Sequence, residues 1–251
     1  MVSRPFRELS RARAQRAREL AVQFEAAREP LLFFAAVAEF QASCVPIDVN
    51  WEELSDLRIP VCELIRRAGT DSMKKALQDL LPESFEGLLL GYRRRATVDA
   101  PECLPARILL QPWAYSHSMA KGTRAGEGTV EWSRTCPRCA HYPQVGLLRG
   151  VGHGQALSLV CALCLHEWPS PRNICTACGK EGREVLAYYS ADGFPARSLQ
   201  CCNACRSYVH LIDLEEDAAA VADADEMAGL VLDVWAVDQG FKKQQLNLAG
   251  I

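Results

Sequence analysis

Four Cys-x-x-Cys pairs stand within seventy residues of the chain: Cys136/Cys139, Cys161/Cys164, Cys175/Cys178 and Cys202/Cys205. Two intervening residues let one tight turn, here called a knuckle, aim both thiolates at the same metal ion. Two knuckles complete a tetrahedral site of four thiolates, so the eight cysteines predict two metal ions. Zinc and iron both accept this geometry, and the spacing does not choose between them.

The loops between the knuckles predict which pairs share an ion. There are 21 residues between Cys139 and Cys161 and 23 between Cys178 and Cys202, enough for one hairpin in each loop. We therefore assign the first site to Cys136, Cys139, Cys161 and Cys164, and the second site to Cys175, Cys178, Cys202 and Cys205. An interleaved pairing is the alternative, because spacing alone does not fix connectivity.

Each loop contains a predicted β-hairpin. In the first loop, residues 144–149 and 155–160 have strand composition on either side of a glycine-rich turn at 150–154. In the second loop, residues 184–190 and 196–201 flank another glycine-containing turn. Knuckle, hairpin and knuckle thus occur twice, as an internal repeat at an offset of about forty residues.

Other interpretations of the cysteines were weighed. Cys201 could replace Cys202, but the spacing of Cys202 from Cys205 matches the other knuckles, so we interpret Cys201 as a small strand residue. Disulfides need an oxidising compartment, and residues 1–20 lack the apolar segment of a secretory signal. A thioredoxin-like dithiol would need a βαβ pattern, which surrounds none of the pairs. Bound metal explains the four pairs best.

The composition divides the chain into a cysteine-poor first half and a cysteine-rich second half. Nine of the twelve cysteines follow residue 135, and the formal net charge is −3. No apolar run reaches the roughly 18 residues that span a membrane. Helical spacing of apolar residues predicts an all-helical domain over residues 1–128, with a linker at 121–129. Metal modules at 129–170 and 171–214 and an acidic helical segment at 215–251 complete an α+β chain.

Opposite charges gather near the two ends of the chain. Residues 1–20 hold six arginines against two glutamates, at the start of a helix predicted over residues 7–28. Such a helix can meet nucleic acid or an acidic protein face, although a solvated helix face is the simpler interpretation. Residues 211–241 contain nine acidic and no basic side chains, which argues against a nucleic-acid surface there. Two short helices are expected on either side of residues 223–226.

Further motifs surround the knuckles. In the first module they are Cys136-Pro137-Arg138-Cys139, Leu148-Arg149-Gly150, Gly152-His153-Gly154, and Cys161-Ala162-Leu163-Cys164 with Glu167-Trp168. Later come Ile174-Cys175-Thr176-Ala177-Cys178-Gly179, Cys202-Asn203-Ala204-Cys205 with Tyr208, and Leu232-Asp233 through Asn247-Leu248-Ala249-Gly250. Over about residues 136–251 the chain resembles the bacterial formate dehydrogenase accessory proteins, the FdhE family. It departs from that family at Ala140 and Leu165, where a glycine or small polar residue is usual.

The resemblance implies a helical N-terminal domain followed by two rubredoxin-like modules. It also implies a cytoplasmic, non-catalytic assembly factor that binds the catalytic subunit of a molybdenum- or tungsten-containing formate dehydrogenase. Iron has been associated with the family, and zinc stays open for this chain. Closed four-cysteine sites and the lack of a nucleophile motif or phosphate loop agree with that interpretation. No nucleic acid and no membrane span are expected, and homo-oligomerisation is left open.

Two other functions were considered. A rubredoxin-like electron carrier would need reversible redox of the bound metal, and a zinc-ribbon nucleic-acid binder would need more basic hairpins than this chain has. For an assembly factor, we expect the partner surface at the cleft between the helical half and the metal modules. Arg149, Trp168 and Tyr208 lie beside knuckles or hairpins and are the candidate contacts. Packing between modules is their alternative role, and the favoured one for Trp168.

Overall fold

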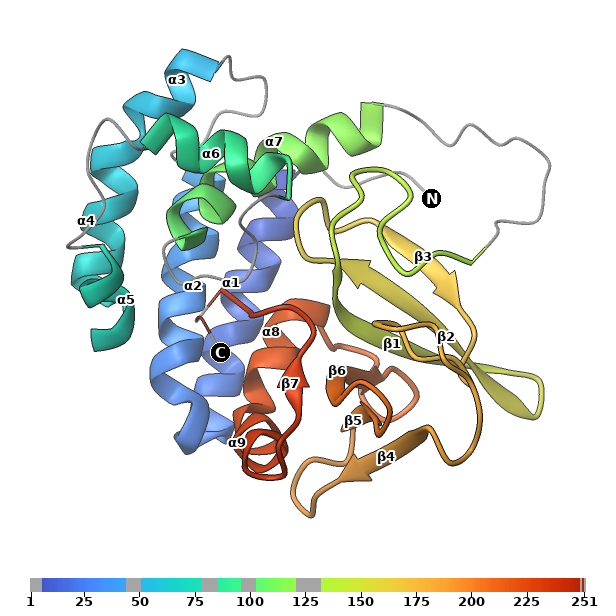
Figure 1. The fold of residues 1–251 in the computed structure, drawn as a ribbon. Coiled ribbons are helices and arrows are strands. Elements are labelled where there is room, and N and C mark those ends of the chain that lie inside the picture. Colours follow the sequence, from blue (N-terminus) through green and yellow to red (C-terminus); the bar gives the residue numbers. More distant parts are fainter. Residues whose placement is uncertain are drawn as a thin grey trace.

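The computed structural model of the chain describes residues 6–43, 51–77, 85–95, 103–120, 132–248 and 250. Helices form one side of the molecule and a β-sheet forms the other, as Figure 1 shows. The C-terminal helices α8 (Ala222–Ala228) and α9 (Leu230–Asp238) lie against both sides. The expected linker at 121–129, and with it the boundary between the first two expected domains, falls outside the described residues.

The helical region begins with two long helices that pack side by side. These are α1 (Phe6–Gln23) and α2 (Arg28–Ser43), joined by the short 3-10 helix η1 (Glu25–Ala27). Five more helices follow among the described residues: α3 (Trp51–Asp56), α4 (Arg58–Ala68), α5 (Asp71–Ala76), α6 (Phe85–Arg93) and α7 (Leu104–Ala120). The residues described before 132 contain no strand, in agreement with the sequence analysis.

Both predicted hairpins are present. Strand β1 (Pro143–Val151) pairs antiparallel with β2 (Gly154–Cys161), and β4 (Leu186–Ser190) pairs antiparallel with β5 (Arg197–Cys202). Strand β3 (Glu167–Ser170), which pairs with β2, is not among the strands that the sequence predicts.

The two hairpins belong to one sheet. Strand β6 (Ser207–Asp213) pairs antiparallel with β5 and parallel with β1, which joins the modules edge to edge. The strand order is β3-β2-β1-β6-β5-β4, and the short β7 (Lys242–Lys243) pairs with the beginning of β6. A parallel pair needs a long connection between its strands, and here β2, β3 and the whole second hairpin form that connection.

One hydrophobic core joins the helices to the sheet. It contains Phe34 of α2, Ile108 of α7, Leu159 of β2 and Leu211 of β6, each at most 1% exposed. Side chains therefore fill the expected cleft along this contact. The predicted α+β fold class is confirmed: a helical N-terminal region, a sheet with two four-cysteine clusters, and short C-terminal helices.

Residues 223–226 form most of α8 instead of separating two helices. Asp223, Asp225 and Glu226 are buried, with at most 7% of each residue exposed. Each carboxylate pairs with a basic side chain from another element. The expected break between two helices at residues 223–226 is thus wrong. Ion pairs inside the fold compensate the charges that favoured an exposed segment.

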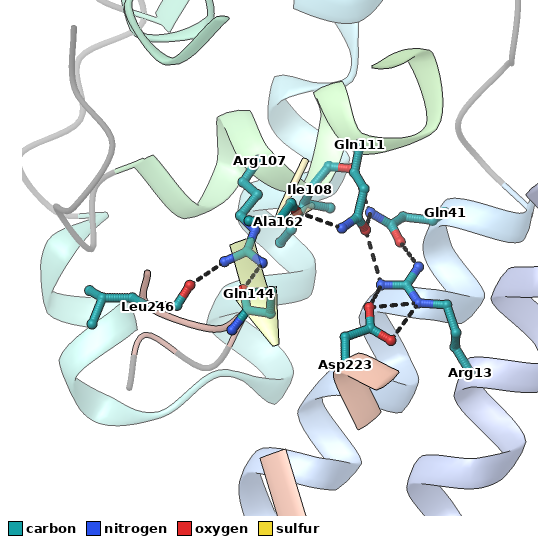
Figure 2. A network of polar contacts seen from close by, with 9 residues as sticks. All are labelled: Arg13, Gln41, Arg107, Ile108, Gln111, Gln144, Ala162, Asp223 and Leu246. Carbon is teal, nitrogen blue, oxygen red and sulfur yellow. Dashed lines mark hydrogen bonds and ion pairs between the residues drawn. The ribbon is translucent and has the colours of Figure 1, made fainter. Parts of the chain in front are cut away.

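Arg13 of α1 is the centre of a buried polar network, drawn in Figure 2. Its side chain is 1% exposed and donates two hydrogen bonds of 2.6 and 2.9 Å to Asp223 of α8. It also donates to the side-chain oxygens of Gln41 on α2 and Gln111 on α7, each at 3.0 Å. Gln111 Nε2 donates onward to the carbonyl of Ala162, inside a knuckle, at 3.1 Å. The network therefore connects four helices with the first cysteine cluster.

Gln41 also compensates a defect in α7. Pro112 lies inside that helix and has no N–H, so the carbonyl of Ile108 lacks its helical donor. Gln41 Nε2 donates to this carbonyl at 2.8 Å. The carbonyl that Pro112 would leave unsatisfied therefore accepts a hydrogen bond from a residue of the Arg13 network.

The arginine-rich face of α1 meets the acidic segment of the same chain. Arg16 donates to Asp225 at 2.7 and 2.9 Å and pairs with Asp217. Arg197 of β5 pairs with the same Asp225, whose side chain is 0% exposed. The sequence-based interpretations of these arginines, a partner surface or a solvated helix face, are therefore corrected for Arg13 and Arg16.

We expect Arg13→Ala to lower the free energy of unfolding by about 3–5 kcal/mol, because it leaves the Asp223 carboxylate buried without its partner. Arg18→Ala on the same helix is the matched control. The Arg18–Glu39 pair is about half exposed, and exposed pairs contribute about 0–1 kcal/mol. Denaturant titration of both variants measures the difference. Equal losses in the two variants would contradict the central role of Arg13.

Candidate metal centres

The first two knuckles bring together Cys136, Cys139, Cys161 and Cys164. The Sγ atom of Cys139 lies 3.3 Å from that of Cys161 and 3.4 Å from that of Cys164, and all four sulfurs lie within 4.8 Å of one another. Four sulfurs at about 2.3 Å from one ion would be separated by about 3.8 Å at the corners of a tetrahedron. The spacing fits a metal ion and is far longer than the roughly 2.05 Å of a disulfide.

The last two knuckles form the second cluster, with Cys175, Cys178, Cys202 and Cys205. Its Sγ atoms are 3.7 Å apart for Cys175 and Cys205, and 3.8 Å apart for Cys178 and Cys202. These four also lie within 4.8 Å of one another. The eight cysteines thus form the two groups expected from the loop lengths, without interleaving, and both groups could bind metal ions.

All four knuckles adopt the same turn. The residue after the second cysteine has a positive φ in each, 61° at Ala140, 55° at Leu165, 78° at Gly179 and 59° at Arg206. Its N–H donates to the carbonyl of the first cysteine of the knuckle. Glycine adopts this conformation freely, whereas a residue with a Cβ atom is strained in it. The three knuckles without glycine are strained copies of the Gly179 turn.

Backbone N–H groups inside the knuckles point at sulfur. The N–H groups of Arg138, Leu163 and Ala177 each lie 3.4 Å from the sulfur of the first cysteine in their knuckle. A hydrogen bond to the charged form of a group favours that form. The turns therefore stabilise the thiolates that a metal ion requires.

Cys201 faces away from the second cluster. It is buried in a small apolar cluster with Leu199, Tyr208 and Phe241, because successive residues of β5 point to opposite faces of the sheet. Burial raises the pKa of its thiol to about 12, so the thiol stays protonated at neutral pH. The choice of Cys202 over Cys201 as a member of the second group agrees with this geometry.

The two clusters differ in depth. Cys136, Cys161 and Cys164 are at most 2% exposed and belong to the core that joins helices and sheet. The second cluster belongs to a small apolar group with Leu186, and its Cys178 is partly exposed. The first site is part of the main core, and the second lies at the edge of the sheet.

The three candidate partner contacts have different environments. Trp168 and Tyr208 are each 2% exposed. The Trp168 indole donates to the carbonyl of Ser133 at 2.8 Å, and the Tyr208 hydroxyl donates to Asp233 at 2.7 Å. Both side chains are enclosed by the chain itself, which agrees with the packing role favoured for Trp168 and corrects the partner contact expected of Tyr208. Arg149 stays 43% exposed and pairs with Glu167.

His210, Glu226 and Asp233 form a third group of potential ligands among the described residues. Lys243 Nζ lies 3.0 Å from Asp233 and contacts Glu226, so an ammonium group occupies the place of a cation. Burial by itself would raise the pKa of Asp233, but His210 and Lys243 hold it below its usual range. The group is a buried ion-pair network. Sequence analysis missed it because its members come from four separate elements.

We expect the reduced protein to hold two metal ions per chain. Cys202→Ser should lower that number to one, because three sulfurs and a hydroxyl make a poor replacement for four thiolates. Cys201→Ser is the matched control and should keep both ions, since Cys201 lies on the other face of β5. Elemental analysis of the purified variants measures this. Traces of metal in the unmutated protein, or equal losses in the two variants, would rule the assignment out.

We expect Ala140→Gly to raise the free energy of unfolding by about 1 kcal/mol, because glycine removes the strain of φ near 61°. Ala140 is exposed, so the change removes little packing. Arg206→Gly is the comparison at an equal φ. It should gain less, because the Arg206 guanidinium lies 3.8 Å from the centre of the Phe241 ring. Thermal unfolding of the metal-loaded variants tests the ranking, and a less stable Ala140→Gly variant would refute the strain.

Comparison with known proteins finds relatives of one kind. The family model described as "FdhE, C-terminal domain" matches residues 174–249. The chain is 28% identical over 196 residues to an FdhE homologue of Aquifex aeolicus, covering 76% of this chain and 68% of the relative. It is 32% identical over 211 residues to an FdhE homologue of Pectobacterium atrosepticum, covering 80% of this chain and 66% of the relative. The chain thus spans about two thirds of the length of these relatives.

A solved structure has the same fold. The crystal structure of the FdhE protein from Pseudomonas aeruginosa superimposes with a TM-score of 0.68 at 20% sequence identity, over 97% of this chain and 96% of that chain. At this identity the likeness concerns the fold, whereas the sequence matches concern the family. Taken with the cysteine motifs, they show that the chain belongs to the FdhE family, the formate dehydrogenase accessory proteins.

Proposed function

We propose that this protein is a non-catalytic accessory factor that binds the catalytic subunit of formate dehydrogenase during its maturation. Membership of the FdhE family is the observation that carries the proposal. The relatives are named for that family, and the chain has both the helical region and the two four-cysteine clusters on which a binding role would depend.

The chemistry of the clusters supports a role without turnover. Four sulfurs complete the tetrahedron around an ion, so neither site leaves a coordination position for a substrate. Two buried polar networks, those of Arg13 and of Asp233, are engaged in contacts within the fold. Structural support and electron transfer are the two tasks that closed sites can perform, and the first suits an assembly factor.

We further propose that each cluster holds one ion of iron or zinc, with the eight knuckle cysteines as ligands. The ligands must be thiolates, so the sites require a reducing environment. The cytoplasm supplies it, and we place the protein there. Among the described residues, no helix is long and apolar enough to cross a membrane.

Nucleic acid is a poor partner for this molecule. Three of the basic side chains that could contact nucleic acid form ion pairs inside the fold. Arg13 pairs with Asp223, and Arg16 and Arg197 pair with Asp225. Nucleic-acid binding needs a basic face, whereas this chain has a net charge of −3.

We retain Arg149 as the candidate partner contact. It lies on β1 near the tip of the first hairpin, with its guanidinium held by Glu167 and by the Ser158 hydroxyl at 2.7 Å. Such a fixed, half-exposed arginine loses little conformational freedom on binding, and arginines of this kind are enriched in interfaces. The exposed Arg183 of the second module is the matched control.

A strain that lacks this protein should lose formate dehydrogenase activity and mature catalytic subunit. The unmutated protein should restore both and should co-purify with the catalytic subunit under anaerobic, reducing conditions. The variant Cys161→Ser/Cys164→Ser should fail to restore them. Cys178→Ser removes a cysteine of the second site, at the edge of the sheet, and so tests the loss of that site apart from a collapse of the main core. Arg149→Ala should weaken co-purification while Arg183→Ala leaves it unchanged.

Two outcomes would end the proposal. One is full formate dehydrogenase activity in the deletion strain, with normal levels of mature subunit and without a compensating paralogue. The other is restored maturation with no detectable binding of the catalytic subunit by the unmutated protein. Loss of binding in Arg183→Ala but not in Arg149→Ala would move the contact to the second module.

A further inference from the structure

A cavity of about 390 Å³ lies where helices α6 and α7 meet the knuckles of the first cluster. Its wall consists of residues from four places in the chain, which are Arg93, Trp113, Ala114, His117, Ser118, Arg138, Cys139 and Leu163. It is the part of the junction between helices and sheet that the shared core leaves open. Cys139, the most exposed member of the first cluster, lines it.

The charged side chains that line this cavity are mainly basic. Two guanidinium groups and an imidazole line it beside the sulfur of Cys139, and its described lining residues include no carboxylate. Three other surface cavities each carry at least one carboxylate, Glu39 and Glu63 in one and Glu29 in the other two. Charge complementarity therefore separates this cavity from the others and points to a negatively charged occupant.

The cationic groups are held in place over a flat apolar surface. The Arg93 guanidinium lies 4.7 Å from the centre of the Trp113 ring, and the rings of Trp113 and His117 are 4.2 Å apart. Arg138 Nη1 lies 3.3 Å from the Ser118 hydroxyl oxygen and also donates to the Ser118 carbonyl. Guanidinium groups fixed in this way lose little side-chain entropy when they bind an anion.

We propose that this cavity binds an oxyanion carried on an apolar or aromatic group. The planar fork of arginine matches the oxygens of a carboxylate or a phosphate, and the indole and Leu163 offer apolar surface beside it. The volume is that of a site for a small ligand or a single side chain. A carboxylate on a partner's acidic segment and a phosphate ester are two sources of this chemistry.

A competing role for the arginines is to balance the thiolates of the first cluster. Four thiolates around one divalent ion keep a net negative charge, and Arg138 adjoins Cys139 in the sequence. If charge balance were their whole role, the cavity would not distinguish an anion from a neutral molecule of the same shape. A titration with matched ligands therefore separates the two roles.

The experiment follows the indole ¹⁵N–H signal of Trp113 in the metal-loaded full chain, assigned with Trp113→Phe. Benzoate, phenyl phosphate and neutral benzamide are titrated separately. Saturable shifts with benzoate or phenyl phosphate, and none with benzamide, are expected. Stronger binding of benzoate would identify a carboxylate site, and stronger binding of phenyl phosphate would identify a phosphate site. The absence of saturation by either anion, or equal shifts with benzamide, would overturn the proposal.

Arg93→Gln tests the assignment to this cavity. It should weaken anion binding about tenfold, which is the loss of one charge-assisted hydrogen bond. The neighbouring exposed Arg94 does not line the cavity, so Arg94→Gln should bind as the unmutated protein does. Equal weakening in both variants would show a general charge effect and contradict a built site. Because the probes are small anions, the result does not depend on the proposed protein partner.

Discussion

The burial of the Arg13 guanidinium is the constraint on which the rest of the structure depends. A charge at 1% exposure is tolerated only when each side of it meets an acceptor, and these acceptors come from α8, α2 and α7. Asp223 is separated from Arg13 by 210 residues, so the network closes only after both ends of the chain are in place. The helical region and the acidic C-terminal segment are therefore parts of one folding unit.

The same constraint reaches the metal centres through a chain of amides. Gln111 accepts from Arg13 and donates to the carbonyl of Ala162, which lies between the second pair of cysteines in the first cluster. The position of that knuckle thus depends on the helices behind it as well as on the cysteine cluster to which it belongs. At the second cluster, Gln244 Nε2 likewise donates to the carbonyl of Thr176 at 3.1 Å, but Gln244 follows the short strand β7 and is not one of the residues bonded to Arg13. A repeat that looks symmetric in sequence has become asymmetric in the fold.

Local features of this protein could be predicted from its sequence, and long-range ones could not. Cys-x-x-Cys spacing and alternating apolar residues act over a few positions, so the knuckles, both hairpins and the first-half helices were found. The parallel pairing of β1 with β6 carries no local signal. Whether a charged side chain is buried has no local signal either. Arg13 and the exposed Arg18 stand on one helix, and the residue that faces each in the fold decides which of the two is buried. The partner contact expected of Tyr208 was wrong for the same reason.

These relations bear on how a recognition site can be built into this fold. The two knuckles of the first cluster supply the Ala162 carbonyl to the Arg13 network, and Arg138, Cys139 and Leu163 to the wall of the proposed anion-binding cavity. Both features rest on backbone turns whose cysteines could hold a metal ion, and a metal site of this kind contributes directly to folding free energy. Loss of the proposed ion would disturb the core and the cavity together. The proposed metal site would thus be linked to the shape of the proposed anion-binding cavity, which is the kind of coupling that an assembly factor needs.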